Sequence, residues 1–555
     1  MPPESLPIAW PACRPSYRAA VVCRLTALAP WAASLLAGGL LALAAPPHDL
    51  WPLGLVGLMP LWLAIRAVRP GVAFMLAWLA GVTALMLATP WWLGLLKDFA
   101  RLGLAPSLGL MLVASAYQAL VFGAWAGVLR LLQIRYRVNP LLAGPLLFAA
   151  LESSLPFFFK MYLAITVWRA WPLTQAAEVG GPAAVSALLV LANLVLAELL
   201  LSRWRRLPVT SSVTIGAALF GLIVAGGFLR AAQVAALRTK APVMQVGLIQ
   251  PNFGVLSAQE RQMHGDRYVK ALQQTTAALA KAGAELIVWP ESAWPYPLDR
   301  GLKHDFPAGH PWTLRQGFGG RLLFGTLSRT MGELPVYNSA VLLDQEGAMA
   351  GRYDKNTLLP FGEYIPLADF FPATAGRLRE TMDHWPAITE GSSPPLLKDG
   401  VLRLGIAICS EDLAPRMPSA DGEQAPNLLI SLASNAWFGT SGAPLQHLAL
   451  ASFRAIEARR DLVRATNTGV SALVDPLGRV LAEGPLAVAG GDRSAVPLTM
   501  MADARLLEAS AWPPLLRLAF PFCCALLVAG AALRKKISRT KPHSINPGQR
   551  SDASL

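Results

Sequence analysis

The chain has 555 residues, of which 54% are hydrophobic and 15% are charged. Soluble proteins carry about 25% charged residues, so the composition excludes a wholly soluble protein. The net charge of +14 would suit a nucleic-acid-binding protein, but residues 243–505 hold 23 Lys and Arg against 26 Asp and Glu. The positive charge therefore belongs to the apolar remainder, and we set binding to nucleic acid aside.

Residues 1–235 are almost continuously apolar and predict a membrane domain. A helix needs about 20 apolar residues to cross a bilayer. Candidate spans lie at about 26–45, 51–68, 71–96, 104–132, 140–159, 182–201 and 209–231, with a further one at 513–533. Proline and glycine interrupt several of them, which membrane helices tolerate when neighbours satisfy the freed backbone groups. We expect about seven crossings before the polar region, one after it, and a basic tail at 534–555.

Basic residues are concentrated in alternate connections between these spans. They follow the second, fourth and sixth spans, at Arg66, Arg69, Arg130, Arg135, Arg137, Arg203, Arg205 and Arg206, and they recur in both terminal segments. In membrane proteins the cytoplasmic loops carry the excess of Lys and Arg. Both termini are therefore predicted to be cytoplasmic, and residues 243–505 to lie on the opposite side of the membrane.

The first span and Glu152 each allow two interpretations. A basic arm, an apolar run of about 19 residues and the small-residue end LALAAPP are similar to a cleaved signal peptide. The length of the run and the spans that follow favour an uncleaved anchor. Glu152 lies within the fifth span, where an ionisable residue is a functional candidate. Helix packing, or a position near the membrane interface, would also explain it.

From Val243 onward the pattern changes to short apolar strands separated by helical segments. Strands are expected at 243–250, 286–292, 321–327, 339–344, 402–408 and 427–434, and helices at 262–282 and 446–461. The segments LVRATNTG and SALVDPLGRVLAEG complete the pattern, the second with a turn at Asp475-Pro476. Continuous apolar runs are typical of strands covered on both faces. Residues 243–505 therefore predict an α/β layered domain.

Cys409 is the only cysteine of this domain and ends the apolar run LGIAI, just before the polar turn SED. The others are Cys13, Cys23, Cys523 and Cys524. A free cysteine is usually a small buried hydrophobe. At a strand end beside a polar turn, Cys409 is also a candidate nucleophile, which would need a base and a nearby positive group.

Several residues are candidates to activate this thiol. His447 would form a Cys–His pair, although no Asn or Asp stands out to orient it and a packing role fits equally well. Glu291 follows the apolar run LIVW, Lys355 follows Tyr-Asp, and Glu363 comes eight residues after Lys355. Taken singly, each of these also fits a solvated loop residue.

Taken together, the ordered set resembles the nitrilase, or carbon–nitrogen hydrolase, superfamily over residues 243–505. The resemblance implies an αββα sandwich with a Glu–Lys–Cys triad. With the spans on either side, the whole chain is similar to the apolipoprotein N-acyltransferases of Gram-negative bacteria. The matching segments are APPHDLWPLGLVGLMPLWLAIR, VGLIQPN, YDK with LLPFGEYIP, NAWFGTSGAPLQH and RAIEARRDLVRATNTG.

The resemblance assigns a role to each candidate. It makes Glu291 the general base, Cys409 the nucleophile, and Lys355 the group that stabilises the oxyanion together with the backbone N–H of Ser410. Acidic residues that support the site are Glu363 and Glu411. The sequence departs from the family at Ser410, where Tyr is frequent, at Asn356-Thr357 after the lysine, and between spans five and six, where FKMYLAITVWRAWPLTQ replaces a Gly-Tyr-Ser-Gln type motif.

The function implied is that of an acyltransferase in the bacterial inner membrane, with its catalytic domain on the periplasmic face. It would take an acyl chain from a phospholipid, typically phosphatidylethanolamine, and pass it to the N-terminal amine of a diacylglyceryl apolipoprotein. The segments 295–312 and 361–376 would be lids or packed surface loops. No metal-ligand spacing is present and no cofactor is expected. The alternatives are a membrane-tethered amidase or nitrilase that hydrolyses a small amide, and a transporter or receptor with an inert nitrilase-like domain.

Overall fold

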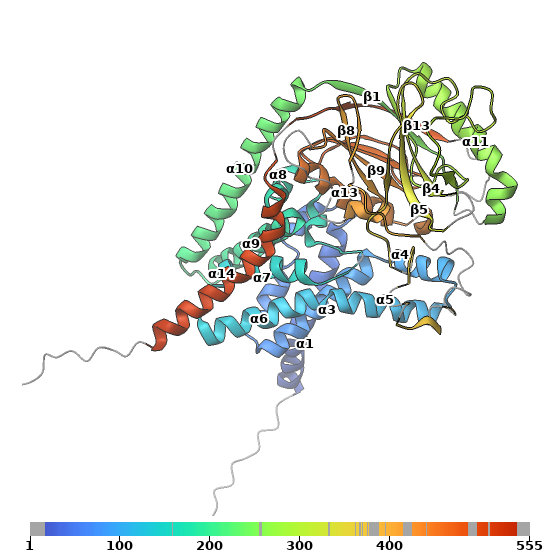
Figure 1. Cartoon of the computed structure of the whole chain (residues 1–555). Helices are drawn as coiled ribbons and strands as arrows, with labels where there is room; N and C mark the ends of the chain where they lie inside the picture. Colours follow the sequence, from blue (N-terminus) through green and yellow to red (C-terminus); the bar gives the residue numbers. More distant parts are fainter. Residues whose placement is uncertain are drawn as a thin grey trace, which may run out of the picture.

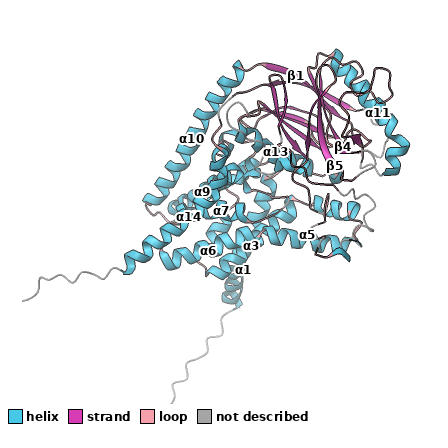
Figure 2. Cartoon of the chain, in the orientation of Figure 1, coloured by secondary structure: helices cyan, strands magenta, loops and turns pink. Residues whose placement is uncertain are grey.

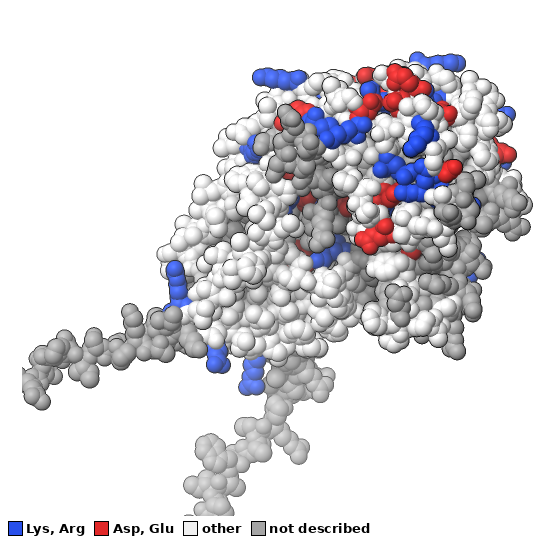
Figure 3. Space-filling model, in the orientation of Figure 1, with Lys and Arg blue, Asp and Glu red and all other residues white. Residues whose placement is uncertain are grey.

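The computed structural model describes residues 17–540 apart from 158, 255–257, 331–333, 361, 366–367, 369, 374–375, 377–387, 395, 414–424, 440, 487–496 and 509–510. Within these residues the chain forms a helical half and a half built of strands and helices, which lie against each other (Figures 1 and 2). Charged side chains gather over the second half, and the visible face of the helical half is largely without them (Figure 3).

The helical half follows the apolar segments of the sequence. Its helices are α1 (Tyr17–Ala44), α2 (Met59–Ile65), α3 (Pro70–Ala88), α4 (Trp91–Gly94), α5 (Leu104–Gln118), α6 (Leu120–Tyr136), α7 (Pro140–Ser154), α8 (Trp171–Thr174), α9 (Ala177–Trp204), α10 (Ser211–Lys240) and α14 (Pro514–Thr540). Three short turns of other helix types are η1 (Trp51–Leu55), η2 (Leu95–Phe99) and η3 (Leu163–Val167).

Five stretches of helix in the described residues are long and apolar enough to cross a membrane. They are Pro70–Ala88, Leu104–Tyr136, Ala177–Trp204, Ser211–Lys240 and Pro514–Arg534. Shorter apolar helices occupy three more of the expected spans, at Leu28–Ala44, Trp51–Ile65 and Pro140–Ser154. The structure thus contains membrane helices, and the number of crossings stays a prediction.

The expected span at 51–68 is not one continuous helix. The structure has the turn η1 followed by the seven-residue helix α2, and a proline lies in the first turn of each. Proline has no N–H and is accommodated at the start of a helix rather than inside it. Pro60 therefore marks the start of a separate helix within a segment whose hydropathy alone suggested a single span.

Two sheets form the second half of the chain. In the first, the strands run in the order β13 (Leu498–Arg505), β1 (Val243–Gln250), β2 (Leu286–Val288), β4 (Arg321–Arg329), β5 (Tyr337–Leu343) and β6 (Met349–Asp354), with β3 (Leu298–Asp299) beside β4. In the second, the order is β12 (Val480–Glu483), β11 (Ala472–Val474), β10 (Leu462–Thr466), β9 (Leu428–Ala433), β8 (Leu402–Ile408) and β7 (Leu396–Asp399).

The two sheets pack face to face between two helical layers. Val246 and Leu248 of the first sheet share one buried core with Ile406 and Ile430 of the second. On the outer face of the first sheet, α11 (Ala258–Lys281) supplies buried residues to a separate core. On the other side, α13 (Ala443–Ala458) packs with the second sheet. The predicted αββα sandwich is therefore confirmed.

The helix α13 also joins the sandwich to the membrane helices. Its residues Phe453 and Ile456 belong to the same buried core as residues of α3, α7 and α9. Near its first turn, Gln446 accepts a hydrogen bond from Trp91 Nε1 over 2.8 Å and donates one to the Ala88 carbonyl over 2.6 Å. Because α13 is shared by both halves, the sandwich is held against the bundle by one continuous core.

Buried ion pairs reinforce this junction. Glu178 of α9 accepts from Arg459, which follows α13, over 2.6 Å, and from Arg230 of α10 over 2.7 Å. Further along α10, Arg238 donates to Asp461 over 2.8 Å. Removing one partner of a buried pair leaves an uncompensated charge and costs about 3–5 kcal/mol. The long helix α10 is thus tied to both halves.

Glu152 lies buried near the end of α7. Its Oε1 accepts a hydrogen bond from the backbone N–H of Leu163 over 2.7 Å, at the start of η3. The carboxylate therefore fixes a turn against a helix, and this contact supports the packing interpretation of Glu152.

Candidate active site

Cys409 stands at a sharp turn between a buried strand and a short helix. The strand β8 ends at Ile408, and the 3-10 helix η4 runs from Cys409 to Leu413. Cys409 has φ +53°, in the left-handed region that a non-glycine residue enters at a cost of about 1–3 kcal/mol. Such a turn lifts the side chain out of the sheet, and the thiol is half-buried rather than enclosed.

Glu291 comes to this thiol from the other sheet. It follows β2 by three residues, is only 8% exposed and lies close enough to Cys409 for its charge to raise the pKa of the thiol. Its Oε1 accepts a hydrogen bond from Asn338 Nδ2 on β5 over 2.9 Å. Asn338 therefore holds the carboxylate of Glu291 in place next to Cys409.

The backbone of the Glu291 loop lies flat on the neighbouring strand β4. The point of closest approach is Gly325, where an added Cβ would lie 2.4 Å from the carbonyl oxygen of Pro290 and 2.7 Å from the Cα of Glu291. Glycine is needed here because no side chain fits between the strand and the loop. The position of Glu291 thus depends on a residue 34 positions later in the chain.

Lys355 follows β6 and is 1% exposed. Its ammonium lies 2.7 Å from Oε2 of Glu363. The other oxygen of Glu363 accepts a hydrogen bond from Asn338 Nδ2 over 3.1 Å, so Asn338 links Glu363 to Glu291. The base, the lysine and the supporting carboxylate therefore form one connected group.

Glu411 connects the nucleophile turn to the loop that carries the lysine. Its Oε1 accepts hydrogen bonds from Tyr353 Oη over 2.7 Å and from the backbone N–H groups of Asn356 and Thr357 over 2.8 and 3.0 Å. Its Oε2 accepts from the N–H of Ile408 over 2.8 Å. Burial raises the pKa of Glu411, and these hydrogen bonds and Lys355 oppose that rise. The carboxylate sets the distance between β8 and the residues after β6.

The negative groups around Cys409 are balanced by the positive charge of Lys355 within the buried site. Burial raises the pKa of Glu291 and of the Cys409 thiol, and each negative neighbour adds to this, whereas Lys355 opposes it. Burial by itself would lower the pKa of Lys355, but Glu363, Cys409 and Glu291 hold that pKa above its usual value. Lys355 therefore stays positive beside the thiol and Glu291.

This arrangement is suited to acyl transfer. A proton that passes from the thiol to Glu291 leaves a thiolate beside a fixed ammonium, so no uncompensated charge is created in the buried space. Preorganised donors of this kind stabilise a developing oxyanion by several kcal/mol without reorganising during the reaction. The side-chain hydroxyl of Ser410 has no hydrogen-bond partner among the described residues, so the oxyanion role expected for this residue rests on its backbone N–H.

His447 does not take the place of Glu291 as the base. Its Nε2 donates to Oδ1 of Asp412 over 2.7 Å, and its Nδ1 accepts from Asn435 Nδ2 over 3.1 Å. Because both ring nitrogens are engaged, neither is available to receive the thiol proton. Burial, together with nearby Arg464, also lowers the pKa of His447.

Sequence reasoning singled out the three candidate catalytic residues but missed three polar residues in and around the site. These are Asn338, Asp412 and Asn435, and the structure assigns each a contact with the site or with His447. Asp412 stands in the polar turn directly after Cys409, and this position in the sequence could have marked it as a partner of the site. Asn338 and Asn435 have no local signal, since their partners come from distant segments.

The two segments expected to form lids differ in how much of them is described. In 295–312, Tyr296 stacks on Trp312 with ring centroids 4.9 Å apart, which supports a packed loop. In 361–376, several residues lie outside the described part of the chain, and Phe370 and Phe371 are exposed. Exposed aromatic side chains beside the Lys355 loop are compatible with contact to lipid, and the lid role stays a prediction.

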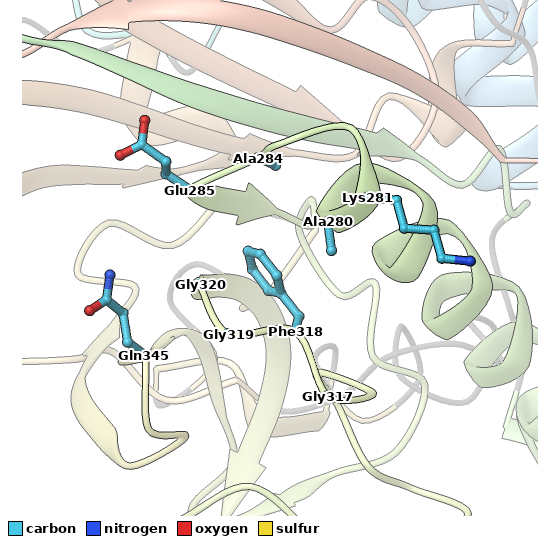
Figure 4. A pocket seen from close by; sticks show the side chains of 9 residues that line it. All are labelled: Ala280, Lys281, Ala284, Glu285, Gly317, Phe318, Gly319, Gly320 and Gln345. Carbon is cyan, nitrogen blue, oxygen red and sulfur yellow. The ribbon is translucent and has the colours of Figure 1, made fainter.

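A shallow hollow of about 490 Å³ lies elsewhere on the sandwich (Figure 4). Its lining includes Lys281, Glu285 and the loop 317–320, before β2 and β4 begin. Glu291 follows the opposite end of β2, so this hollow is separate from the triad. Among the described residues, no group of three or more His, Cys, Asp or Glu is placed to hold a metal ion.

Two family models match the chain. The carbon-nitrogen hydrolase model matches residues 245–490, which contain all the candidate site residues of the sandwich. The model of the apolipoprotein N-acyltransferase N-terminal domain matches residues 37–195, within the helical half. Among solved structures, an amidase of the nitrilase superfamily from Nesterenkonia is 17% identical and covers 48% of this chain and 93% of its own, with a TM-score of 0.32.

Curated relatives match nearly the whole chain. The apolipoprotein N-acyltransferase of Geobacter metallireducens is 30% identical over 473 residues, which cover 82% of this chain and 86% of the relative. That of Azotobacter vinelandii is 31% identical over 539 residues, which cover 93% and 97% of the two chains. That of Pseudomonas aeruginosa is 30% identical over 499 residues, covering 86% and 92%. With its membrane helices, its sandwich and both matching models, this chain belongs to the apolipoprotein N-acyltransferase family.

Proposed function

We propose that this chain acylates the N-terminal amine of diacylglyceryl-cysteine apolipoproteins, using a membrane phospholipid as donor and a thioester on Cys409 as intermediate. Membership of the family supports the overall reaction. The observation that carries the mechanism is that Glu291 and Lys355, from separate loops, both lie close enough to Cys409 for their charges to act on its thiol. The core shared by α13 and the membrane helices supports a site at the bilayer surface, where both lipid substrates are anchored.

In the first half-reaction the sulfur of Cys409 attacks an ester carbonyl of the phospholipid, and Glu291 takes the thiol proton. Lys355 and the backbone N–H of Ser410 stabilise the oxyanion that forms. When the tetrahedral intermediate collapses, the bond to the glycerol oxygen breaks and Glu291 returns its proton to that oxygen. The products are a thioester on Cys409 and a lysophospholipid.

In the second half-reaction the lipoprotein amine attacks the thioester carbonyl. A free α-amino group has a pKa of about 7.7–8.0, so part of it is neutral near pH 7. Glu291 accepts a proton from the attacking nitrogen, the C–S bond breaks, and the sulfur leaves as a thiolate that regains a proton from Glu291. The products are an amide on the lipoprotein and free enzyme, so the kinetics are ping-pong.

We also propose the finer assignments that follow from this reaction. The donor is phosphatidylethanolamine, the enzyme lies in the bacterial inner membrane, and its sandwich is on the periplasmic face. Residues 1–235 form the membrane domain, 243–505 the catalytic domain and 513–533 the last span. The basic residues of alternate connections support this orientation. A reporter fused after Arg206 should behave as cytoplasmic and one near Gly391 as exported, and the reverse result would overturn the orientation.

Mass spectrometry of purified enzyme incubated with phospholipid tests the intermediate. The acyl adduct should map to Cys409, be released by hydroxylamine and be absent from Cys409→Ala. An adduct that persists in Cys409→Ala would exclude this residue as the nucleophile. Separate incubations with phosphatidylethanolamine and phosphatidylglycerol vesicles test the donor, because the first should load the enzyme faster.

The acceptor distinguishes this activity from that of a membrane-tethered amidase. The matching N-terminal domain does not favour an amidase. The isolated acyl-enzyme should persist with phospholipid alone and discharge when a diacylglyceryl peptide with a free N-terminus is added. An N-acetylated peptide of the same sequence is the matched control and should leave the thioester intact. Discharge at equal rates with either peptide, or with none, would instead indicate a hydrolase.

A further inference from the structure

The residues behind the nucleophile turn form a second polar group that the proposed mechanism does not use. Asp412, three residues after Cys409, is fully buried and points back beneath the turn. One oxygen accepts from His447, as described above, and the other accepts from Ser431 Oγ over 2.6 Å and from the guanidinium of Arg464. The partners come from α13, β9 and β10, so three separate elements converge under one short turn.

The charges of this group cancel within it. Burial would raise the pKa of Asp412, but the guanidinium of Arg464 and the contact with His447 hold that pKa well below its usual range. The imidazole of His447 faces Arg464 and Asp412 as its charged neighbours, and burial with Arg464 lowers its pKa. The group therefore consists of one anion, one cation and a neutral ring. It adds no net charge to the reacting centre on the other side of the turn.

His447 is the member of this group that links the nucleophile turn to α13. Its hydrogen bond to Asp412 reaches η4 three residues after Cys409, and its contact with Asn435 reaches the residues that follow β9. It lies at the start of α13, which packs directly against η4. The backbone of Cys409 is in the left-handed region, where a non-glycine residue persists only when its surroundings hold it there. A ring fixed at both nitrogens is a rigid support for such a conformation.

We propose that His447, oriented by Asp412 and Asn435, is a positioning residue that holds the Cys409 turn in its reactive conformation. It acts through the backbone, by placing the sulfur toward Glu291 and the N–H of Ser410 toward the oxyanion, and it does not exchange protons with substrate. This inference rests on the proposed role of Cys409 as the nucleophile. It adds a requirement on the opposite side of the turn from the triad.

The test uses the full-length enzyme and the rate of acyl-enzyme formation in a single turnover. His447→Leu removes the polar ring contacts at similar volume, whereas His447→Gln keeps an amide that can donate to Asp412. We expect His447→Leu to form acyl-enzyme at least tenfold more slowly, with an unchanged KM for phospholipid. We expect His447→Gln to recover several-fold of that loss. Misplacement of a reacting group by about 1 Å can cost roughly 100-fold in rate.

The matched control is Phe453→Leu, which alters a fully buried residue on the same helix in the core shared with the membrane helices. It should lower the thermal stability without changing the rate per folded molecule. If His447→Leu does not fold, Asn435→Ala provides the comparison, since it removes the donor to Nδ1 and leaves the ring in place. A wild-type rate in His447→Leu or, should that variant not fold, in both His447→Gln and Asn435→Ala would overturn the proposal. So would equal losses in His447→Leu and His447→Gln, which would mean that only the imidazole's shape matters.

Cys409→Ala separates this inference from the proposed function. If the adduct is lost in Cys409→Ala while His447→Leu retains a wild-type rate, only the positioning role is wrong. If the adduct remains in Cys409→Ala, the nucleophile is wrong and the positioning role fails with it.

Discussion

The contact between Gly325 and the Glu291 loop offers a direct test of how the base is placed. Gly325→Ala adds one methyl group on β4, on the side that faces Pro290 and Glu291. The new Cβ would lie 2.4 Å from the Pro290 carbonyl oxygen, 2.7 Å from the Cα of Glu291 and 2.9 Å from the N of Ser292. All three atoms belong to backbone, so no side-chain rotation relieves the contact.

The size of the effect follows from these distances. Cβ contacts shorter than 3.0 Å are essentially not observed, so the gap to Pro290 must widen from 2.4 Å by 0.6 Å or more. A shift of this size moves the Glu291 loop relative to Cys409. Misplacement by about 1 Å can cost roughly 100-fold in rate, so we expect a loss of about 10- to 100-fold in acyl-enzyme formation. Overpacking of this kind also destabilises a fold by about 1–3 kcal/mol.

The assay is single-turnover acylation by phospholipid, with the melting temperature measured on the same samples. Gly319→Ala is the matched control, because a Cβ at Gly319 would meet nothing within 4 Å. It should keep both the wild-type rate and the wild-type stability. A Gly325→Ala enzyme that is destabilised but acylates at the wild-type rate per folded molecule would refute the reasoning, since the position of Glu291 would then not limit the reaction.

Four further outcomes are expected. Glu291→Gln keeps a hydrogen-bonding group but removes the base, so single-turnover acylation should slow by about 10²- to 10⁴-fold; a loss of less than threefold would contradict the assignment. In the wild-type enzyme Glu291 must be ionised to accept a proton and its pKa is raised by burial, so acylation measured against pH should fall on acidification at a pH above the usual range of a carboxylate, and a rate independent of pH between 4 and 8 would argue against it. Ser410→Ala removes a hydroxyl with no partner in the described chain and leaves the backbone N–H, so turnover should stay within about twofold of wild type, and a large loss would place the hydroxyl in the reaction. Glu178→Ala leaves Arg459 and Arg230 without their shared partner and should destabilise the protein by about 3–5 kcal/mol, seen as a lower melting temperature in detergent; an unchanged melting temperature would show that this junction does not contribute to stability.

The local pattern of apolar residues was enough to predict the membrane helices and many of the strands. Runs of apolar residues at membrane length predict membrane helices, because a bilayer requires about 20 of them whatever surrounds the segment. Short apolar runs covered on both faces predict the strands of the sandwich. Glu291, Lys355 and Cys409 each follow such a strand, and the resemblance to the nitrilase superfamily assigned their roles. Within the described residues the predicted fold is confirmed and these three side chains come together, whereas their catalytic roles stay a prediction.

Only the tertiary structure showed which residues hold Glu291, Lys355 and Cys409 in place. Asn338 bridges Glu291 and Glu363, and Gly325 makes room for the Glu291 loop, through contacts between segments that are far apart in the chain. His447 was considered from sequence as a base without an orienting partner, yet Asp412 and Asn435 occupy both of its nitrogens. Periodicity reports which face of an element is buried. The partner of a buried polar group depends on which elements pack together, and that is known only when the chain has folded.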